Sequence, residues 1–162
     1  MSDPTRVIAI DVDLGRFTAV HSTRGVLADN HRKGLFPTKF TDALYDVDVL
    51  LLEVAGPVMH HAESHSHRRW MIYNALWIGY LLGGIPEHST LGHDSCFVCP
   101  STIWTKGYDE KSRQAIAGLP GVAKKADHDV RECLTMIDFY RKDPSVWVPL
   151  DQYMLSLCPK AK

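Results

Sequence analysis

Two short apolar runs, each followed by an acid, constrain the fold of this chain most. Val7–Ile10 is followed by Asp11, and Val49–Leu52 is followed by Glu53. Runs of this length are typical of strands buried on both faces, in the centre of a sheet. A carboxylate at the end of such a strand costs free energy unless a cation, a donor or water meets it. Two central strands ending this way could place both carboxylates at the same rim of one sheet.

The order of the elements predicts an α/β fold with a mixed sheet and helices packed against it. Strand hairpins come first, and strands then alternate with helices. The expected strands are 6–11, 16–22, 25–28, 48–53 and 95–98, and the expected helices are 39–45, 65–82, 109–117 and 127–140. The last helix carries an apolar face, because Val130, Cys133, Leu134 and Ile137 follow the i, i+3, i+4, i+7 spacing.

Composition narrows the class of protein. With 162 residues, a single domain is expected. Lys+Arg number 18 and Asp+Glu 19, so the net charge of -1 excludes a general polycation but leaves room for a local basic strip. The longest apolar stretch, Trp70–Leu82, is shorter than a membrane span, and no signal-peptide pattern begins the chain. Four cysteines do not make a disulfide scaffold, so a cytoplasmic protein is expected.

A third acidic segment lies on the last predicted helix. Asp129 and Glu132 stand at i and i+3, so their like charges share one face. Oxygen donors from three separate segments suit a hard cation such as Mg²⁺ or Mn²⁺. Any one of these acids alone would more often cap a turn or a helix, and Asp127 or Asp129 could do so here. The recurrence at two buried strands and one helix favours the metal interpretation.

Two other segments offer metal ligands of a softer kind. His60, His61, His65 and His67 fall close together, in a Ser-containing stretch that is expected to be exposed rather than to bind zinc. His93, Cys96 and Cys99 form a second candidate, but one Cys-x-x-Cys pair is a weak zinc signal. The buried-strand interpretation, with cysteine as a small apolar residue, is preferred there.

Four segments, taken in order, resemble the RuvC-type Holliday junction resolvases of the RNase H-like superfamily, particularly the compact phage and bacterial members. The segments are Ile8–Asp11 with Gly15 and Thr18, Leu50–Glu53, Val98–Lys106 and Lys124–Leu134. The resemblance covers about residues 6–142, which leaves 143–162 as a C-terminal extension of one nuclease domain. Three positions depart from the family: Asp13 stands where a small residue or a Pro-Gly turn usually follows the first acid, Cys133 replaces the usual Ala, and Glu132 is one methylene longer than Asp.

The resemblance implies an RNase H-like fold with a mixed five-stranded sheet flanked by helices. It also implies a Mg²⁺-dependent endonuclease that cuts four-way DNA junctions by two-metal hydrolysis, with Mn²⁺ as a substitute. The catalytic acids would be Asp11, Glu53, Asp129 and Glu132, all of them metal ligands. His128 or Asp127 could replace or assist one of them, because both lie within two residues of Asp129.

The resemblance further implies DNA contacts and a homodimer. The expected DNA-binding residues are Met59, Arg68, Arg69, Lys106, Lys111, Lys124 and Lys125. Lys106 is the preferred phosphate contact, whereas Lys111 could equally be a solvated surface residue. Met59 could unstack bases or fill a core. The helix at 65–82 is apolar nearly all round, so it is either central or packs on a second subunit, as the family's equivalent helix does.

Three alternatives remain open from the sequence. One is an RNase H-like nuclease acting on other branched DNA or on RNA. Another is a non-catalytic nucleic-acid-binding or protein-interaction module that keeps the sheet without the chemistry. The third is a zinc-stabilised binding protein that uses His93, Cys96 and Cys99.

Overall fold

The computed structural model describes six longer stretches of the chain and three single residues. These are residues 5–12, 15–32, 34–54, 76–81, 83, 85, 89, 91–100 and 128–157. The helices, strands and contacts of the fold and of the candidate site lie within these residues.

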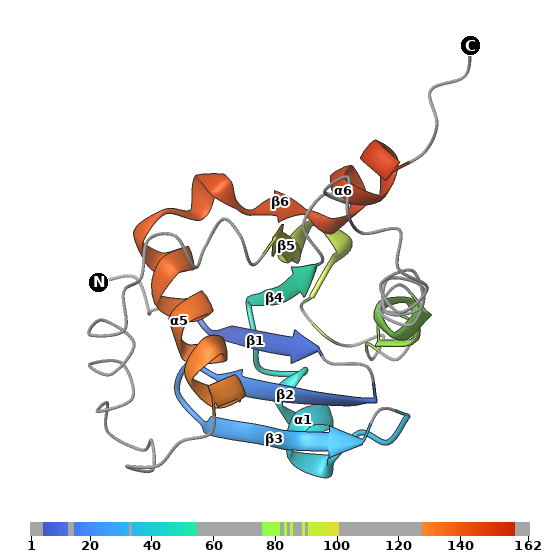
Figure 1. Ribbon diagram of the computed structural model, residues 1–162, viewed down its shortest axis with the longest axis vertical. Helices are drawn as coiled ribbons and strands as arrows, with labels where there is room; N and C mark the ends of the chain where they lie inside the picture. Colours follow the sequence, from blue (N-terminus) through green and yellow to red (C-terminus); the bar gives the residue numbers. More distant parts are fainter. Residues whose placement is uncertain are drawn as a thin grey trace.

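A six-stranded mixed sheet forms the centre of the molecule, with strand order β3-β2-β1-β4-β5-β6 (Figure 1). The strands are β1 (Val7–Val12), β2 (Arg16–His21), β3 (Gly25–Arg32), β4 (Val49–Val54), β5 (Cys96–Pro100) and β6 (Val148–Pro149). β1, β2 and β3 form antiparallel hairpins, β4 and β5 run parallel to β1, and β6 is antiparallel to β5. β1 and β4 are therefore the central pair.

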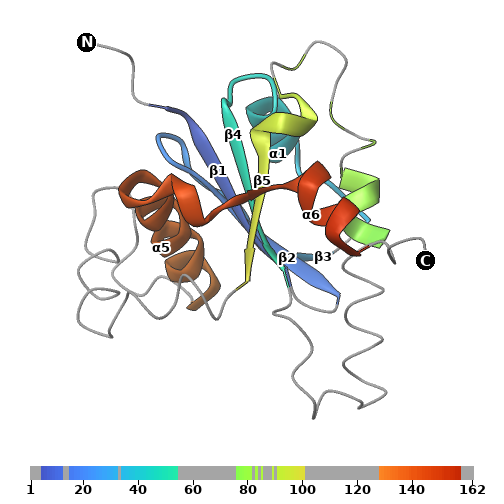
Figure 2. The same ribbon diagram turned by 90° about the horizontal axis from the view of Figure 1, so that it is seen from above.

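Helices cover both faces of this sheet, as Figure 2 shows from above. The long α5 (His128–Lys142) lies on one face, and α1 (Thr38–Ala43), α6 (Leu150–Leu157) and a helical segment at 76–81 lie on the other. Two short 3-10 turns, η1 (His93–Ser95) and η3 (Pro144–Val146), precede β5 and β6.

Strand alternation divides the interior into two apolar clusters. In β1, Ile8 and Ile10 belong to the cluster that contains α1 and α6 residues, whereas Val7 and Ala9 belong to the cluster that contains α5 residues. β4 repeats the pattern, with Leu50 and Leu52 in the first cluster and Val49 and Leu51 in the second. Because successive side chains point to opposite faces, a central strand must be apolar throughout, as both runs are.

The α/β class and the mixed sheet predicted from sequence are confirmed. The expected five strands are joined by a sixth, β6, whose two residues pair with Phe97 and Val98. α6 also lies in the segment for which the sequence predicted no element. β3 runs to Arg32, four residues beyond the predicted end, and α5 ends at Lys142 rather than at Tyr140.

The predicted helix at 65–82 is described only from residue 76. Here Trp77, Ile78 and Leu81 are buried, while Leu76 and Tyr80 are exposed. One face of this segment therefore packs in the core, and the other faces outwards. The predicted helix at 109–117 lies outside the described residues. None of the helices in the described stretches has the length and apolar character needed to cross a lipid bilayer.

Candidate metal centre

β1 and β4 bring the two strand-terminal acids to the same edge and the same face of the sheet. The strands are parallel, and Ala9 lies opposite Leu51 and Ile10 opposite Leu52. One residue further on, Asp11 and Glu53 occupy equivalent positions on the two strands. Both continue the alternation of Ala9 and Leu51, so they point to the face that α5 covers. This confirms the sequence argument that both carboxylates reach one rim.

The first turns of α5 supply the third carboxylate. Val130, Cys133 and Ile137 anchor the inner face of this helix in the core, and Glu132 is half-buried on the same side. One ligand oxygen each from Asp11, Glu53 and Glu132 lies within 4.8 Å of the others. Three acids from three elements therefore converge on one point.

The electrostatics of Asp11 reflect this crowding. Burial, together with the negative charges of Glu132 and Asp129, raises the pKa of Asp11 from its ordinary 3.8 to about 7. A hydrogen bond with Glu53 and the charge of His128 lower this pKa, but their effects are smaller. A carboxyl group with a pKa near neutrality, surrounded by other acids, is a common mark of a functional site. A bound cation would relieve the repulsion that raises this pKa.

Asp129 and His128 lie at the margin of the three converging acids. Asp129 is close enough to raise the pKa of Asp11, but it is not among the acids that meet within 4.8 Å. His128 is exposed, and its ring nitrogens lie 3.4 Å from Asp129 Oδ1 and 3.4 Å from Glu132 Oε1. The imidazole thus bridges the two α5 acids at the mouth of the site.

Cys133 packs directly behind the carboxylates. Its Sγ lies 3.5 Å from the carbonyl oxygen of Thr18, which stands opposite Asp11 in the sheet. Complete burial, together with the nearby negative charge of Asp11, raises the pKa of the Cys133 thiol well above its ordinary value. The thiol is therefore neutral at pH 7 and acts as a small packing group, as expected from its replacement of Ala.

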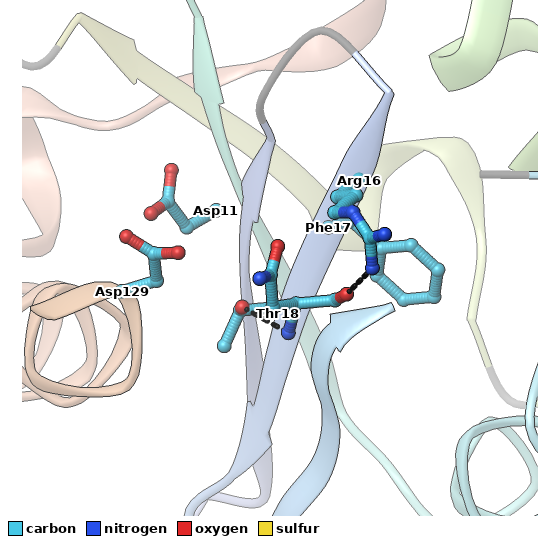
Figure 3. Close-up of a pocket in the computed structure, with 6 residues that line it drawn as sticks. Asp11, Arg16, Phe17, Thr18 and Asp129 are labelled. Atoms are coloured by element: carbon cyan, nitrogen blue, oxygen red, sulfur yellow. Dashed lines mark hydrogen bonds between the residues drawn. The ribbon is translucent and has the colours of Figure 1, made fainter. Parts of the chain in front are cut away.

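A small pocket adjoins the acids. It is lined by Asp11, Arg16, Phe17, Thr18, Asn30 and Asp129. In the view of Figure 3, the carboxylates of Asp11 and Asp129 lie together, and Thr18 lies between them and Arg16. Arg16 and Asn30 were not singled out from the sequence. Arg16 lies two residues before Thr18 in the predicted strand, so both side chains point to the same face of that strand. This spacing is the sequence signal from which Arg16 could have been predicted.

Acids also cluster at the other end of the β1–β4 pair, but arginines there neutralise their negative charge. Arg6 donates to Asp48 through its backbone N–H at 2.8 Å and through Nε at 3.1 Å, and it also pairs with Asp46. Arg24 pairs with Asp46 as well. These bonds lower the pKa of Asp48 to about 2 and that of Asp46 below its ordinary value.

Several predicted site residues lie outside the described residues. They are Asp127 and all the predicted DNA contacts, namely Met59, Arg68, Arg69, Lys106, Lys111, Lys124 and Lys125. The histidine stretch from His60 to His67 lies outside them too. Of the zinc candidates, Cys96 is buried in the core, where burial raises the pKa of its thiol to about 11. That burial fits the preferred interpretation of Cys96 as an apolar strand residue.

The chemistry of the donor set fits a hard divalent cation. Carboxylate oxygens are the ligands that Mg²⁺ and Mn²⁺ prefer, and half-buried acids from separate elements cost free energy without a counter-charge. Among the described residues, Asp11, Glu53 and Glu132 form the group that meets the geometry of a metal site.

Comparison with solved structures finds a similar fold. The chain is similar to Thermus thermophilus RuvC, solved in complex with a Holliday junction substrate, with a TM-score of 0.51 and 8% sequence identity over 88% of this chain and 98% of that chain. No protein-family model matches the sequence. No curated protein sequence matches it either. The similarity confirms the RNase H-like architecture at the level of the fold.

Proposed function

We propose that this protein is a Mg²⁺-dependent, structure-selective endodeoxyribonuclease that resolves four-way DNA junctions. The observation that carries the proposal is the convergence of Asp11, Glu53 and Glu132 within 4.8 Å at one rim of a RuvC-like sheet. The structural neighbour was solved with a Holliday junction, which supplies the substrate class. In this proposal the enzyme acts in the cytoplasm of a bacterial or phage-infected bacterial cell.

The chain's own residues have separate tasks in this proposal. Asp11, Glu53 and Glu132 would hold the cation, and Asp129 with His128 would complete the site at its outer edge. When bound, divalent ions supply the positive charge that activates water and stabilises the leaving oxygen in phosphodiester hydrolysis. β1, β4 and α5 fix the acids before substrate arrives, so little reorganisation is needed at the moment of reaction.

Cleavage of a synthetic junction tests the proposal. The protein is incubated with a fluorescently labelled four-way junction and MgCl₂, and with a linear duplex of the same sequence. We expect cleavage of the junction near its centre, no cleavage of the duplex, and loss of activity in Asp11→Asn. Asp42→Asn, which changes an exposed acid on α1, is the matched control and should cut normally.

Other outcomes identify the alternatives. Cleavage of flapped DNA or of RNA in preference to the junction would indicate a nuclease with a different substrate. Junction binding without cleavage in Mg²⁺ or Mn²⁺ would indicate a non-catalytic module.

A homodimer formed through the helix at 65–82 belongs to the same proposal. The support from the described part of this helix is its outward face, where Leu76 is 65% exposed and Tyr80 is 55% exposed. A two-fold dimer would present two active sites to a junction of matching symmetry. Light scattering should give twice the chain mass, and Leu76→Glu should give the mass of one chain. A wild-type protein that stays monomeric at micromolar concentration would contradict this part.

A further inference from the structure

An exposed pair of arginines lies on the β2–β3 hairpin beside the acidic site. Arg16 and Arg32 are direct cross-strand partners, and both are exposed. Residues directly opposite in an antiparallel pair project to the same face of the sheet, with Cβ atoms about 5 Å apart. Like charges in this position destabilise the pair, so the arrangement favours an anion between or above them.

A β-bulge sets this register. Between the pairs Phe17–His31 and Ala19–Ala28, β3 has two residues where β2 has the single residue Thr18. Asn30, in the bulge, has φ of 46°, in the left-handed region that Asn tolerates better than most residues. Bulges of this kind occur beside active sites, where they re-aim side chains.

Two hydrogen bonds tie the bulge to both the arginine and the acidic pocket. The backbone N–H of Asn30 donates to Thr18 Oγ1 at 3.0 Å, and Thr18 is the sheet partner of Asp11. Arg16 Nη1 donates to the Asn30 carbonyl at 2.8 Å. A guanidinium has five N–H donors, so a guanidinium oriented by one of them can still offer others to a phosphate.

The position of Arg16 matches the needs of a DNA strand at the acids. Arg16 lies two residues along β2 from Thr18, the partner of Asp11, which is roughly 7 Å at ordinary strand spacings. A DNA strand rises about 3.4 Å per nucleotide. A backbone with one phosphate at the acids would therefore bring a phosphate only a few nucleotides away to Arg16 and Arg32.

We propose that Arg16 and Arg32, aligned by the Asn30 bulge, bind a backbone phosphate that flanks the cleaved bond. This inference rests on the proposed nuclease function and adds a binding residue pair on the β2–β3 hairpin. The pair also offsets the repulsion between the acidic rim and a polyanionic strand.

Binding measurements without cleavage test the inference. The full-length protein and its variants are titrated against a fluorescent four-way junction in EDTA, at several salt concentrations. Arg16→Gln and Arg32→Gln should each weaken binding roughly tenfold, as expected for loss of a charge-assisted hydrogen bond. Each should also lower the slope of log K against log salt by about 1. Arg16→Lys should keep the wild-type slope.

The matched control is Arg141→Gln, an exposed arginine in the last turn of α5, away from the acids. It should leave affinity and slope unchanged, and thermal unfolding of each variant checks that the fold is intact. Wild-type affinity and slope in both Arg16→Gln and Arg32→Gln would overturn the inference while junction cleavage still supports the proposed function. Absence of DNA binding by the wild type, together with absence of junction cleavage in MgCl₂, would overturn both.

Discussion

Acids cluster at both ends of the β1–β4 pair, but the electrostatic surroundings of the two clusters are opposite. At the amino end, Asp46 and Asp48 receive the guanidinium groups of Arg6 and Arg24. At the carboxyl end, Asp11 meets Glu53 and Glu132, and its surroundings raise its pKa to about 7. The same two strands thus hold one charge cluster that is neutralised within the protein and one whose repulsion persists. A site of the second kind is suited to bind a cation from solution.

The largest effect that would test this difference is on catalysis. Glu53→Gln keeps the shape of the side chain and removes one of the three converging charges. We expect junction cleavage in Mg²⁺ to fall by on the order of 10³-fold, because several kcal/mol of charge stabilisation depend on the site and each 1.4 kcal/mol is tenfold in rate. Single-turnover cleavage rates measure the loss.

The amino end supplies the control for that experiment. Asp48→Asn should retain the wild-type rate per folded molecule, since Arg6 and Asp48 lie at the far end of the strands. Equal losses of rate in Asp48→Asn and Glu53→Gln would break the contrast between the two ends.

The second prediction concerns the pH dependence of stability without metal. Asp11 binds its proton more tightly in the folded protein, so its contribution to stability is lost as pH rises from about 4 towards 7. Asp11→Asn should therefore become more stable than wild type over this range, by at most about 4 kcal/mol. Urea unfolding in EDTA at a series of pH values gives the free energies.

Asp48 should show the opposite dependence. Its pKa is lowered to about 2, so its stabilisation is present above about pH 4 and is lost as pH falls towards 2. Asp48→Asn should be less stable than wild type at neutral pH, with a difference that shrinks in acid. A stability gain at neutral pH for both variants would contradict the distinction.

A third prediction uses Mg²⁺ as a ligand. Binding to the folded protein at a concentration of 100 times Kd should stabilise it by about 2.7 kcal/mol. We expect MgCl₂ to raise the unfolding temperature of wild type and of Arg6→Gln by similar amounts, and to have little effect on Glu132→Gln. A Mg²⁺ response that survives in Glu132→Gln would place the cation elsewhere.

The smallest effect is expected behind the acids. Cys133→Ala removes a buried thiol that packs against Thr18 and is neutral at pH 7. We expect a loss of about 1 kcal/mol in stability and an unchanged cleavage rate, since Ala is also a small apolar residue. A large loss of activity in Cys133→Ala, measured in the same cleavage assay, would assign the thiol a chemical role.

The acidic rim could be predicted from the sequence because a pattern of neighbouring residues identifies each of its acids. Apolar runs of strand length that end in acids identify Asp11 and Glu53, and helical spacing identifies Glu132. Asp129 was expected to share the site fully, but the structure places it at the margin. A helical spacing of three residues defines a face, and only the packing of α5 decides which acid of that face reaches furthest inwards.

Features that depend on pairing between distant segments were missed. β6 has two residues, one of them Pro149, and it is a strand only because β5 offers an edge. The polar end of β3, from Asp29 to Arg32, carries no strand pattern of its own and extends because β2 pairs with it. The Arg16–Arg32 pair follows from a bulge register that no local pattern encodes.

Crystallographic analysis of the protein in Mn²⁺, with anomalous scattering to locate the ion, tests the central claim most directly. The account predicts a manganese peak coordinated by oxygens of Asp11, Glu53 and Glu132, with a repeat in Asp11→Asn showing a weakened or absent peak. Well-ordered carboxylates pointing apart, with manganese bound only at other positions, would contradict it.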